Sequence, residues 1–129
     1  MAKLRHIAIS TEDPEKTAAW YKEVFGLVEV GKSPVGVYLS DGDINFAVLR
    51  IPSPDHPDQA LRGVNHFGFM VEAPEIAYQK LAELGAQRLP DIPLAGQYVE
   101  VRYEGPDGIS IDISEHGWVG AKPLEPSTD

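Results

Sequence analysis

The chain of 129 residues contains no cysteine, so it has no disulfide framework, no thiolate zinc site and no thiol nucleophile. Any metal ion must therefore be held by histidine, aspartate, glutamate or amide groups. Basic residues are also few, with 11 against 20 acidic residues, and the net charge of −9 repels nucleic acid and anionic lipid. The sequence thus predicts neither a nucleic-acid partner nor a membrane partner.

Long hydrophobic runs are missing as well, because no stretch approaches the roughly 20 apolar residues that span a bilayer. Residues 1–6 lead directly into an alternating apolar pattern and leave no room for a secretory signal, so we expect a cytoplasmic protein. Apolar residues make up 43% of the chain and charged residues 24%, which is the balance of a globular protein. We therefore expect residues 1–129 to form a single domain.

The chain contains two similar halves, and this repeat is the strongest organisational signal in the sequence. The segment LRHIAISTEDPEKTAAWYKEVFG aligns with VNHFGFMVEAPEIAYQKLAELG, so that His6 pairs with His66 and Pro14 with Pro74. Each copy opens with an alternating run, and a proline at the first helical position then begins a helix. A glycine, which accepts a left-handed conformation, ends each helix.

Short β-prone runs follow each predicted helix, so both halves read β-α-β-β-β. A proline-rich linker separates them, and a tail with two further prolines follows the second half. The sequence therefore predicts an α+β fold of two tandem βαβββ modules. Module one is 1–51, the linker 52–63, module two 64–116 and the extended tail 117–129. The β-prone runs after the first helix are 26–30, 36–40 and 44–50, and those after the second helix are 86–89, 98–103 and 109–114.

Alternating side chains distinguish two faces of the predicted strands. The first strand carries bulky Ile7 and Ile9 on one face and His6 among small residues on the other. Its repeat places His66 in the same way, and the last strand places Asp112 on the face opposite its isoleucines. The bulky face suits helix packing, whereas the other combines polar groups with room for a ligand. We predict that His6, His66 and Asp112 lie on one side of the sheet.

Two neutral imidazoles and a carboxylate are the facial triad that binds a divalent ion and leaves positions open for substrate. A single histidine on a strand is more often a structural residue than a ligand. Here, however, both histidines occupy equivalent positions of the repeat, and an acidic residue shares their face. We therefore predict a divalent metal at the junction of the modules, held by His6, His66 and Asp112.

These features resemble the vicinal oxygen chelate superfamily, which includes glyoxalase I, extradiol dioxygenases, methylmalonyl-CoA epimerase, and the fosfomycin and bleomycin resistance proteins. The resemblance rests on LRHIAISTEDPEKTAAWYKEVFGL, VNHFGFMV and EGPDGISIDISE, and it covers residues 4 to about 116. It implies a curved mixed sheet around a central cleft, a small-molecule substrate and a homodimer. It also implies that His6, His66 and Asp112 are the metal ligands.

Two positions depart from the pattern of that family. Ala47 occupies the fourth ligand position, where glyoxalase I and the epimerase have Glu or Gln, and this disfavours lyase and isomerase activities. Asp112 stands where glutamate is usual. Glu115 is an alternative carboxylate ligand, although a regular strand turns it to the other face.

Three ligands with open positions favour an enzyme that resembles the Fe(II) dioxygenases and acts on a small bidentate oxygen ligand, with Mn, Ni or Zn as alternative metals. The alternative is a metal-free binding protein similar to the bleomycin resistance proteins. A thiol transferase is disfavoured, because a phosphonate substrate requires cationic residues that the strands largely lack.

Ring cleavage also requires an acid or base beside the metal. The strand before EGPDG offers Tyr103, if the hairpin loop has an even number of residues, and Arg102, if a bulge makes that number odd. The sequence does not choose between these two catalytic candidates. It also leaves open whether one chain or two chains build the site.

Overall fold

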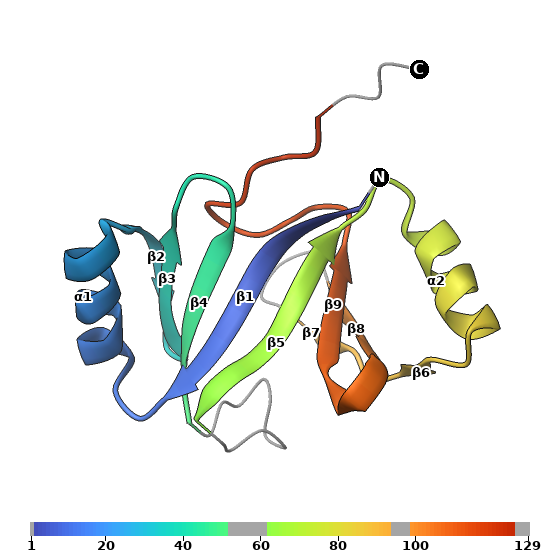
Figure 1. Ribbon diagram of the computed structural model, residues 1–129, viewed down its shortest axis with the longest axis horizontal. Helices are drawn as coiled ribbons and strands as arrows, with labels where there is room; N and C mark the ends of the chain where they lie inside the picture. The colour runs from blue at the N-terminus through green and yellow to red at the C-terminus, as the bar shows by residue number, and fades with distance from the viewer. Residues whose placement is uncertain (1, 52–61, 94–98, 126–129) are drawn as a thin grey trace.

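The computed structural model describes residues 2–51, 62–93 and 99–125. Within these ranges one mixed sheet has the strand order β2-β3-β4-β1-β5-β9-β8-β6, and β7 pairs with β8 (Figure 1). The elements are β1 (Lys3–Thr11), α1 (Pro14–Phe25), β2 (Val28–Ser33), β3 (Gly36–Ser40), β4 (Asn45–Arg50), β5 (Gly63–Met70), α2 (Pro74–Glu83), β6 (Gln87–Arg88), β7 (Ile92–Pro93), β8 (Val99–Glu104), a 3-10 turn (Pro106–Gly108) and β9 (Ser110–Ser114).

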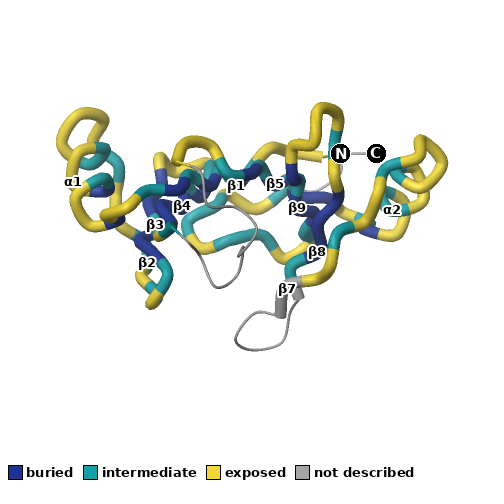
Figure 2. Tube along the Cα trace, turned by 90° about the horizontal axis from the view of Figure 1, so that it is seen from below, coloured by how far each residue is buried: buried dark blue, intermediate teal, exposed yellow. Residues whose placement is uncertain are grey.

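The two modules meet at the centre of the sheet, where β1 and β5 pair antiparallel. Within each module the first strand pairs parallel with the last, β1 with β4 and β5 with β9. The chain trace bends along the row of strands, so the sheet is curved (Figure 2). The predicted α+β fold of two βαβββ modules is therefore confirmed.

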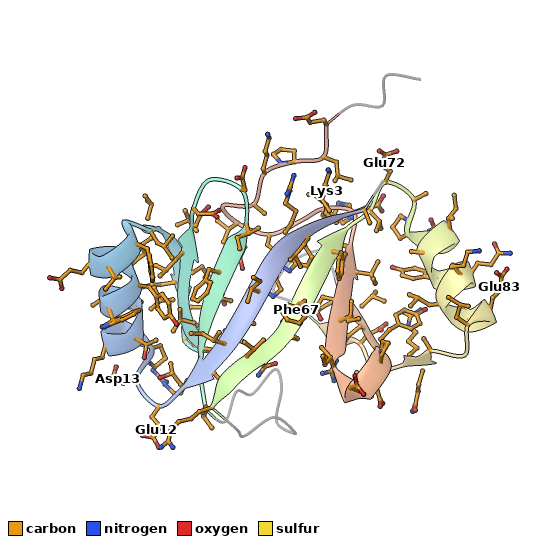
Figure 3. The ribbon with its side chains drawn as sticks, in the orientation of Figure 1. Lys3, Glu12, Asp13, Phe67, Glu72 and Glu83 are labelled. Atoms are coloured by element: carbon orange, nitrogen blue, oxygen red, sulfur yellow. The ribbon has the colours of Figure 1, made fainter. Side chains whose placement is uncertain are left out.

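Both helices begin where the sequence predicts, each with a proline in its first turn. Asp13 caps α1, since its carboxylate accepts a hydrogen bond of 3.2 Å from the backbone N–H of Lys16 (Figure 3). Ala73 gives α2 no such side-chain cap. Gly26 ends α1 in the left-handed conformation, with φ of 71°. No helix in the described ranges is long and apolar enough to cross a membrane.

The helices pack at opposite ends of one face of the sheet (Figure 1). The other face is called the site face below. The core under α1 contains Ala18, Val37, Leu39 and Val48, and the core under α2 contains Val71, Val101, Tyr103 and Ile113.

Two details differ from the expectation or extend it. The strand expected at 26–30 is β2, which starts at Val28 because Gly26 still belongs to the helix end. The short strand β7 was not expected. Of the linker, residues 52–61 lie outside the described part of the chain, as do residues 126–129 of the tail.

The described part of the tail returns to module one. Lys122 N–H donates to the carbonyl of Asp43 at 2.8 Å, and the hydroxyl of Ser40 donates to the carbonyl of Gly120 at 2.7 Å. Arg5 donates to the carbonyl of Lys122 at 3.1 Å. The segment 118–122 is thereby held against module one instead of lying free on the surface.

Candidate metal centre

The pairing register places the predicted ligands in two neighbouring rows on the site face. Each row runs across five strands, in the order β4, β1, β5, β9 and β8, and its middle position lies on β5: Gly68 in the first row and His66 in the second. The first row across the sheet is Asn45, His6, Gly68, Asp112 and Arg102, and the second is Ala47, Ala8, His66, Ser110 and Glu104.

The structure brings His6, His66 and Asp112 together. Nε2 of His6 lies 2.9 Å from Nε2 of His66. Oδ2 of Asp112 lies 3.1 Å from Nε2 of His66 and 3.7 Å from Nε2 of His6. All three side chains are buried, with 1% exposure for His66 and Asp112. Three ligand atoms from three strands thus converge on one point.

The tautomer of His6 is set by Asn45. The amide Nδ2 of Asn45 donates to the carbonyl of Val119 at 2.8 Å, so its Oδ1 is the atom that faces His6. Nδ1 of His6 lies 2.7 Å from this oxygen and must donate to it. Nε2 of neutral His6 therefore carries a lone pair directed at the cluster.

His66 is held in the same way by its neighbour in sequence. Nδ1 of His66 lies 2.6 Å from Oδ1 of Asn65, and Nδ2 of Asn65 donates to the hydroxyl of Ser10 at 2.7 Å. Burial lowers the pKa of His66 to about 4, so the ring is neutral near pH 7 and its Nε2 also presents a lone pair.

This arrangement fits a divalent cation. If both rings are neutral with their protons on Nδ1, the two Nε2 lone pairs, 2.9 Å apart, repel each other, and a bound proton or metal ion between them removes this repulsion. Two nitrogen ligands that are ~2.1 Å from one ion and at right angles lie about 3 Å apart, close to this separation. The second ring nitrogens donate to amide oxygens, as metal-ligating histidines do.

Asp112 supplies the carboxylate of the group. Burial raises its pKa to about 6, and the neighbouring Glu100 and the charge of Arg102 lower that pKa in part. A cation beside Asp112 would stabilise its charged form. Glu115, the alternative carboxylate, is instead half exposed and lies 3.6 Å from His116.

The carboxylate of Glu100 is a fourth possible metal ligand beside His6, His66 and Asp112, and we did not predict it from the sequence. The ligand atoms of His6, His66, Glu100 and Asp112 all lie within 4.8 Å of one another. Glu100 lies on β8 two residues before Arg102, so strand alternation places both on the site face. That alternation was the signal that could have found it.

The two acid–base candidates lie on opposite faces of β8. The loop 105–109 between β8 and β9 has an odd number of residues, and Arg102 pairs with Asp112 on the site face. Tyr103 belongs to the core under α2, where its ring lies 5.9 Å from that of Tyr78. The structure therefore brings Arg102 to the centre and corrects the placement of Tyr103 beside it.

Trp118 of the tail also reaches this site, without any indication in the sequence. Its ring stacks on His6, with centroids 4.7 Å apart and planes at 8°. Gly68 makes room for it, because a Cβ atom there would lie 2.7 Å from the Trp118 ring and 2.8 Å from Cβ of His6. Trp118 and Asn45 together fix the orientation of His6.

Solved structures share this fold. Hypothetical protein BH1468 from Bacillus halodurans C-125 has a TM-score of 0.70 and 18% identity, over 98% of this chain and 99% of that chain. The 2,3-dioxygenase LapB from Pseudomonas sp. KL28 has a TM-score of 0.69 and 22% identity, over 92% of this chain and 42% of that chain. Methylmalonyl-CoA epimerase from Mycobacterium tuberculosis has a TM-score of 0.67 and 15% identity, over 85% of each chain.

At these identities the structural likeness shows the fold alone. A comparison with curated protein sequences gives no significant match. A family model covers most of the chain, however, and confirms the resemblance seen in the sequence. Residues 3–113 match it, and the chain belongs to the Glyoxalase/Bleomycin resistance protein/Dioxygenase superfamily.

Proposed function

We propose that this chain is a divalent-metal-dependent enzyme that binds a small substrate through two adjacent oxygen atoms. One observation carries the proposal: Nε2 of His6, Nε2 of His66 and Oδ2 of Asp112 converge at separations of 2.9 to 3.7 Å. The contacts of both Nδ1 atoms with amide oxygens support it, because they direct the Nε2 lone pairs of the neutral rings at the cluster. His6, His66 and Asp112 would be the ligands. Among the activities of the superfamily we favour an Fe(II) dioxygenase-like reaction, since three ligands leave positions open.

A bound Fe(II) ion would supply Lewis acidity and electron exchange with dioxygen. The chain's own residues prepare the site for it. Asn45 and Asn65 hold the two imidazoles, and Trp118 covers the face of His6. The burial of His6, His66 and Asp112 keeps bulk water away from the reacting atoms.

Arg102 is the catalytic candidate that the geometry supports. A guanidinium keeps its proton throughout the working pH range, so Arg102 acts by charge and hydrogen bonding and not by proton transfer. Tyr103 cannot contact a substrate at this centre while it lies in the core under α2.

Glu100 favours a second candidate, a metal-dependent isomerase or epimerase. Ala47 removes the family's usual fourth carboxylate, but Glu100 brings one from a different strand. A carboxylate next to a Lewis acid can remove a proton from carbon next to a carbonyl. This reaction needs no dioxygen, which separates it from the first candidate.

We also propose a homodimer. The helices cover only the ends of their face of the sheet, and Phe67 lies at its middle between them (Figure 3). Ile7 pairs with Phe67 there, and both side chains are half-buried in the single chain. A second copy would cover this apolar strip, and light scattering of wild type and Phe67→Ser would detect the dimer and its loss. A cytoplasmic location remains a prediction.

Dioxygen uptake tests the proposed reaction. Metal-stripped protein is reconstituted with Fe(II) under anaerobic conditions, mixed with catechol and exposed to dioxygen. We expect uptake by wild type and by His116→Ala, which removes an exposed histidine, and none by His66→Ala. Metal-dependent deuterium exchange at the carbon next to a carbonyl, without uptake, would support the isomerase. Ligand binding that is indifferent to metal would contradict both and support a sequestering protein.

A further inference from the structure

We infer that Arg102 and Ser110 form a subsite for a negatively charged oxygen group next to the metal position. The inference rests on the proposed function, because it places the substrate at this centre. It adds the chemical class of that substrate: a small molecule that carries a carboxylate.

Both side chains are buried and keep an unused polar atom. Arg102 is 6% exposed and Ser110 is 4% exposed. Nη1 of Arg102 and Oγ of Ser110 are shut off from solvent and have no hydrogen-bond partner within the described ranges. Both carboxylate oxygens of Asp112 are unpaired within these ranges as well, and a metal ion would be their partner. Buried polar groups are nearly always paired, so the two remaining donors on this face indicate a further missing partner that accepts hydrogen bonds.

The pairing register places these two groups next to the metal position. Arg102 is paired with Asp112, and Ser110 is paired with His66. Arg102 and Ser110 are therefore diagonal neighbours on β8 and β9, on the site face. The hydrogen bond of 3.1 Å from Nε of Arg102 to the carbonyl of Pro90 fixes the guanidinium and leaves Nη1 for a ligand.

The equivalent positions of module one show that the unpaired groups are not a requirement of the fold. By the repeat, Asn45 corresponds to Ser110, and Tyr38 corresponds to Arg102. Asn45 is bonded to His6 and to Val119, and the hydroxyl of Tyr38 lies 2.8 Å from that of Ser33. The polar groups of Asn45 and Tyr38 are paired in module one, whereas Arg102 and Ser110 each keep an unpaired polar atom in module two.

Charge points to an anionic partner. Glu100, Asp112 and Arg102 together carry one negative charge when ionised, and a divalent ion changes this sum to one positive charge. A buried centre with an excess positive charge favours a ligand with one negative charge. A carboxylate matches the two donors, because its oxygens accept hydrogen bonds from a guanidinium and a hydroxyl.

The test uses a metal ion without redox chemistry. Fluorine NMR follows the binding of 4-fluorobenzoate, and of neutral 4-fluorobenzamide, to protein loaded with Zn(II), whose metal content is measured first. The variants are Arg102→Gln, Ser110→Ala and, as the matched control, Arg50→Gln, which removes an exposed arginine at the end of β4. Amide spectra verify that each variant is folded, and Ser110→Ala, the smaller change, keeps the test decisive if Arg102→Gln does not fold.

We expect wild type and Arg50→Gln to bind 4-fluorobenzoate and not the amide. Arg102→Gln should bind it about tenfold or more weakly, and Ser110→Ala several-fold more weakly. Equal binding by wild type and Ser110→Ala, or no binding by wild type, overturns the inference. Because the Zn(II) content is measured separately, loss of 4-fluorobenzoate binding with Zn(II) bound is distinct from failure of the proposed function, which metal-dependent activity decides.

Discussion

The two modules share one fold but differ in what they place on the site face. In module one that face includes an apolar cluster of Ala8, Ala47 and Leu49, packed against Val35 and Tyr38. In module two the positions equivalent to Ala47 and Tyr38 are Asp112 and Arg102, both charged and buried. Each module contributes one histidine, but only module two contributes charge.

The two modules show how a sequence repeat can form an asymmetric site. The repeat fixes the histidines, because both first strands lie at the centre and pair with each other. Residues on the strands farther from the centre can differ between the modules without disturbing that pairing. Module one therefore has apolar side chains on its half of the site face, whereas module two has ionisable side chains there. A substrate would therefore meet an apolar wall on one side and charged groups on the other.

We expect the greatest change in metal affinity when the carboxylate of Asp112 is removed. Structural zinc sites bind with about 10–16 kcal/mol over four ligands, or roughly 3 kcal/mol per ligand. Asp112→Asn should therefore weaken Zn(II) binding by about 100-fold or more. Ala47→Ser, at the equivalent position of module one, should leave it unchanged. Competition with a chromophoric chelator measures both, and similar affinities for the two variants would contradict the asymmetry.

The pH dependence of stability in metal-stripped protein gives the next effect. Burial raises the pKa of Asp112 to about 6, so its contribution to stability is lost as pH rises through that value. Burial lowers the pKa of His66 to about 4, so its contribution is lost as pH falls through 4. The two contributions oppose each other in wild type, and Asp112→Asn removes only the first.

The Asp112→Asn variant should therefore gain stability relative to wild type as pH rises from about 4 to about 6, by up to about 3 kcal/mol. Urea unfolding across this range measures the difference. Asp107→Asn, which changes an exposed carboxyl group in the 3-10 turn, is the control and should show little trend. A pH-independent difference between wild type and Asp112→Asn would show that Asp112 does not ionise in this way.

Gly68→Ala tests how module two makes room for Trp118. The new methyl group would meet the Trp118 ring and Cβ of His6 at less than 3 Å, so one of them must move. We expect a loss of about 1–3 kcal/mol in unfolding free energy and a change in tryptophan fluorescence. Gly31→Ala on β2 is the control, since its methyl group would make ordinary contacts of 3.5 and 3.7 Å. Equal stability of both variants would mean that Trp118 is not held there.

The smallest effect compares Asn45 with its equivalent, Ser110. Asn45→Ala removes the acceptor for His6 Nδ1 and should weaken metal binding about tenfold. The hydroxyl of Ser110 makes no hydrogen bond to a metal ligand within the described part of the chain. Ser110→Ala should therefore keep a metal affinity within about twofold of that of wild type. Calorimetric titration with Zn(II) measures both variants. Equal losses of Zn(II) affinity in the two variants would indicate that Asn45 and Ser110 support the metal ligands in the same way.

Much of the fold follows from the sequence, because prolines and glycines mark the helix ends and strand alternation separates the faces. The same alternation brought His6, His66 and Asp112 to one side, where the structure places them. The repeat makes this inference strong, since an error in one copy would have appeared as a mismatch with the other.

The remaining features depend on tertiary placement. The position of Tyr103 depended on the number of residues in one hairpin loop, which the sequence alone does not fix. Trp118 lies in a tail without periodic pattern, and its place depends on hydrogen bonds to strands far away in sequence. The position of Glu100 on the site face could have been predicted, because it alternates with Arg102 along the strand. Nothing in its local sequence, however, distinguishes it from a solvated glutamate.

The metal content of the purified protein shows whether His6, His66 and Asp112 bind a metal ion. The protein is purified without an affinity tag, and wild type is analysed by mass spectrometry beside His6→Ala and His116→Ala. We predict about one transition metal ion per chain in wild type and in His116→Ala, and none in His6→Ala. Wild type that stays empty after incubation with Fe(II), Mn(II) or Zn(II) would contradict the account.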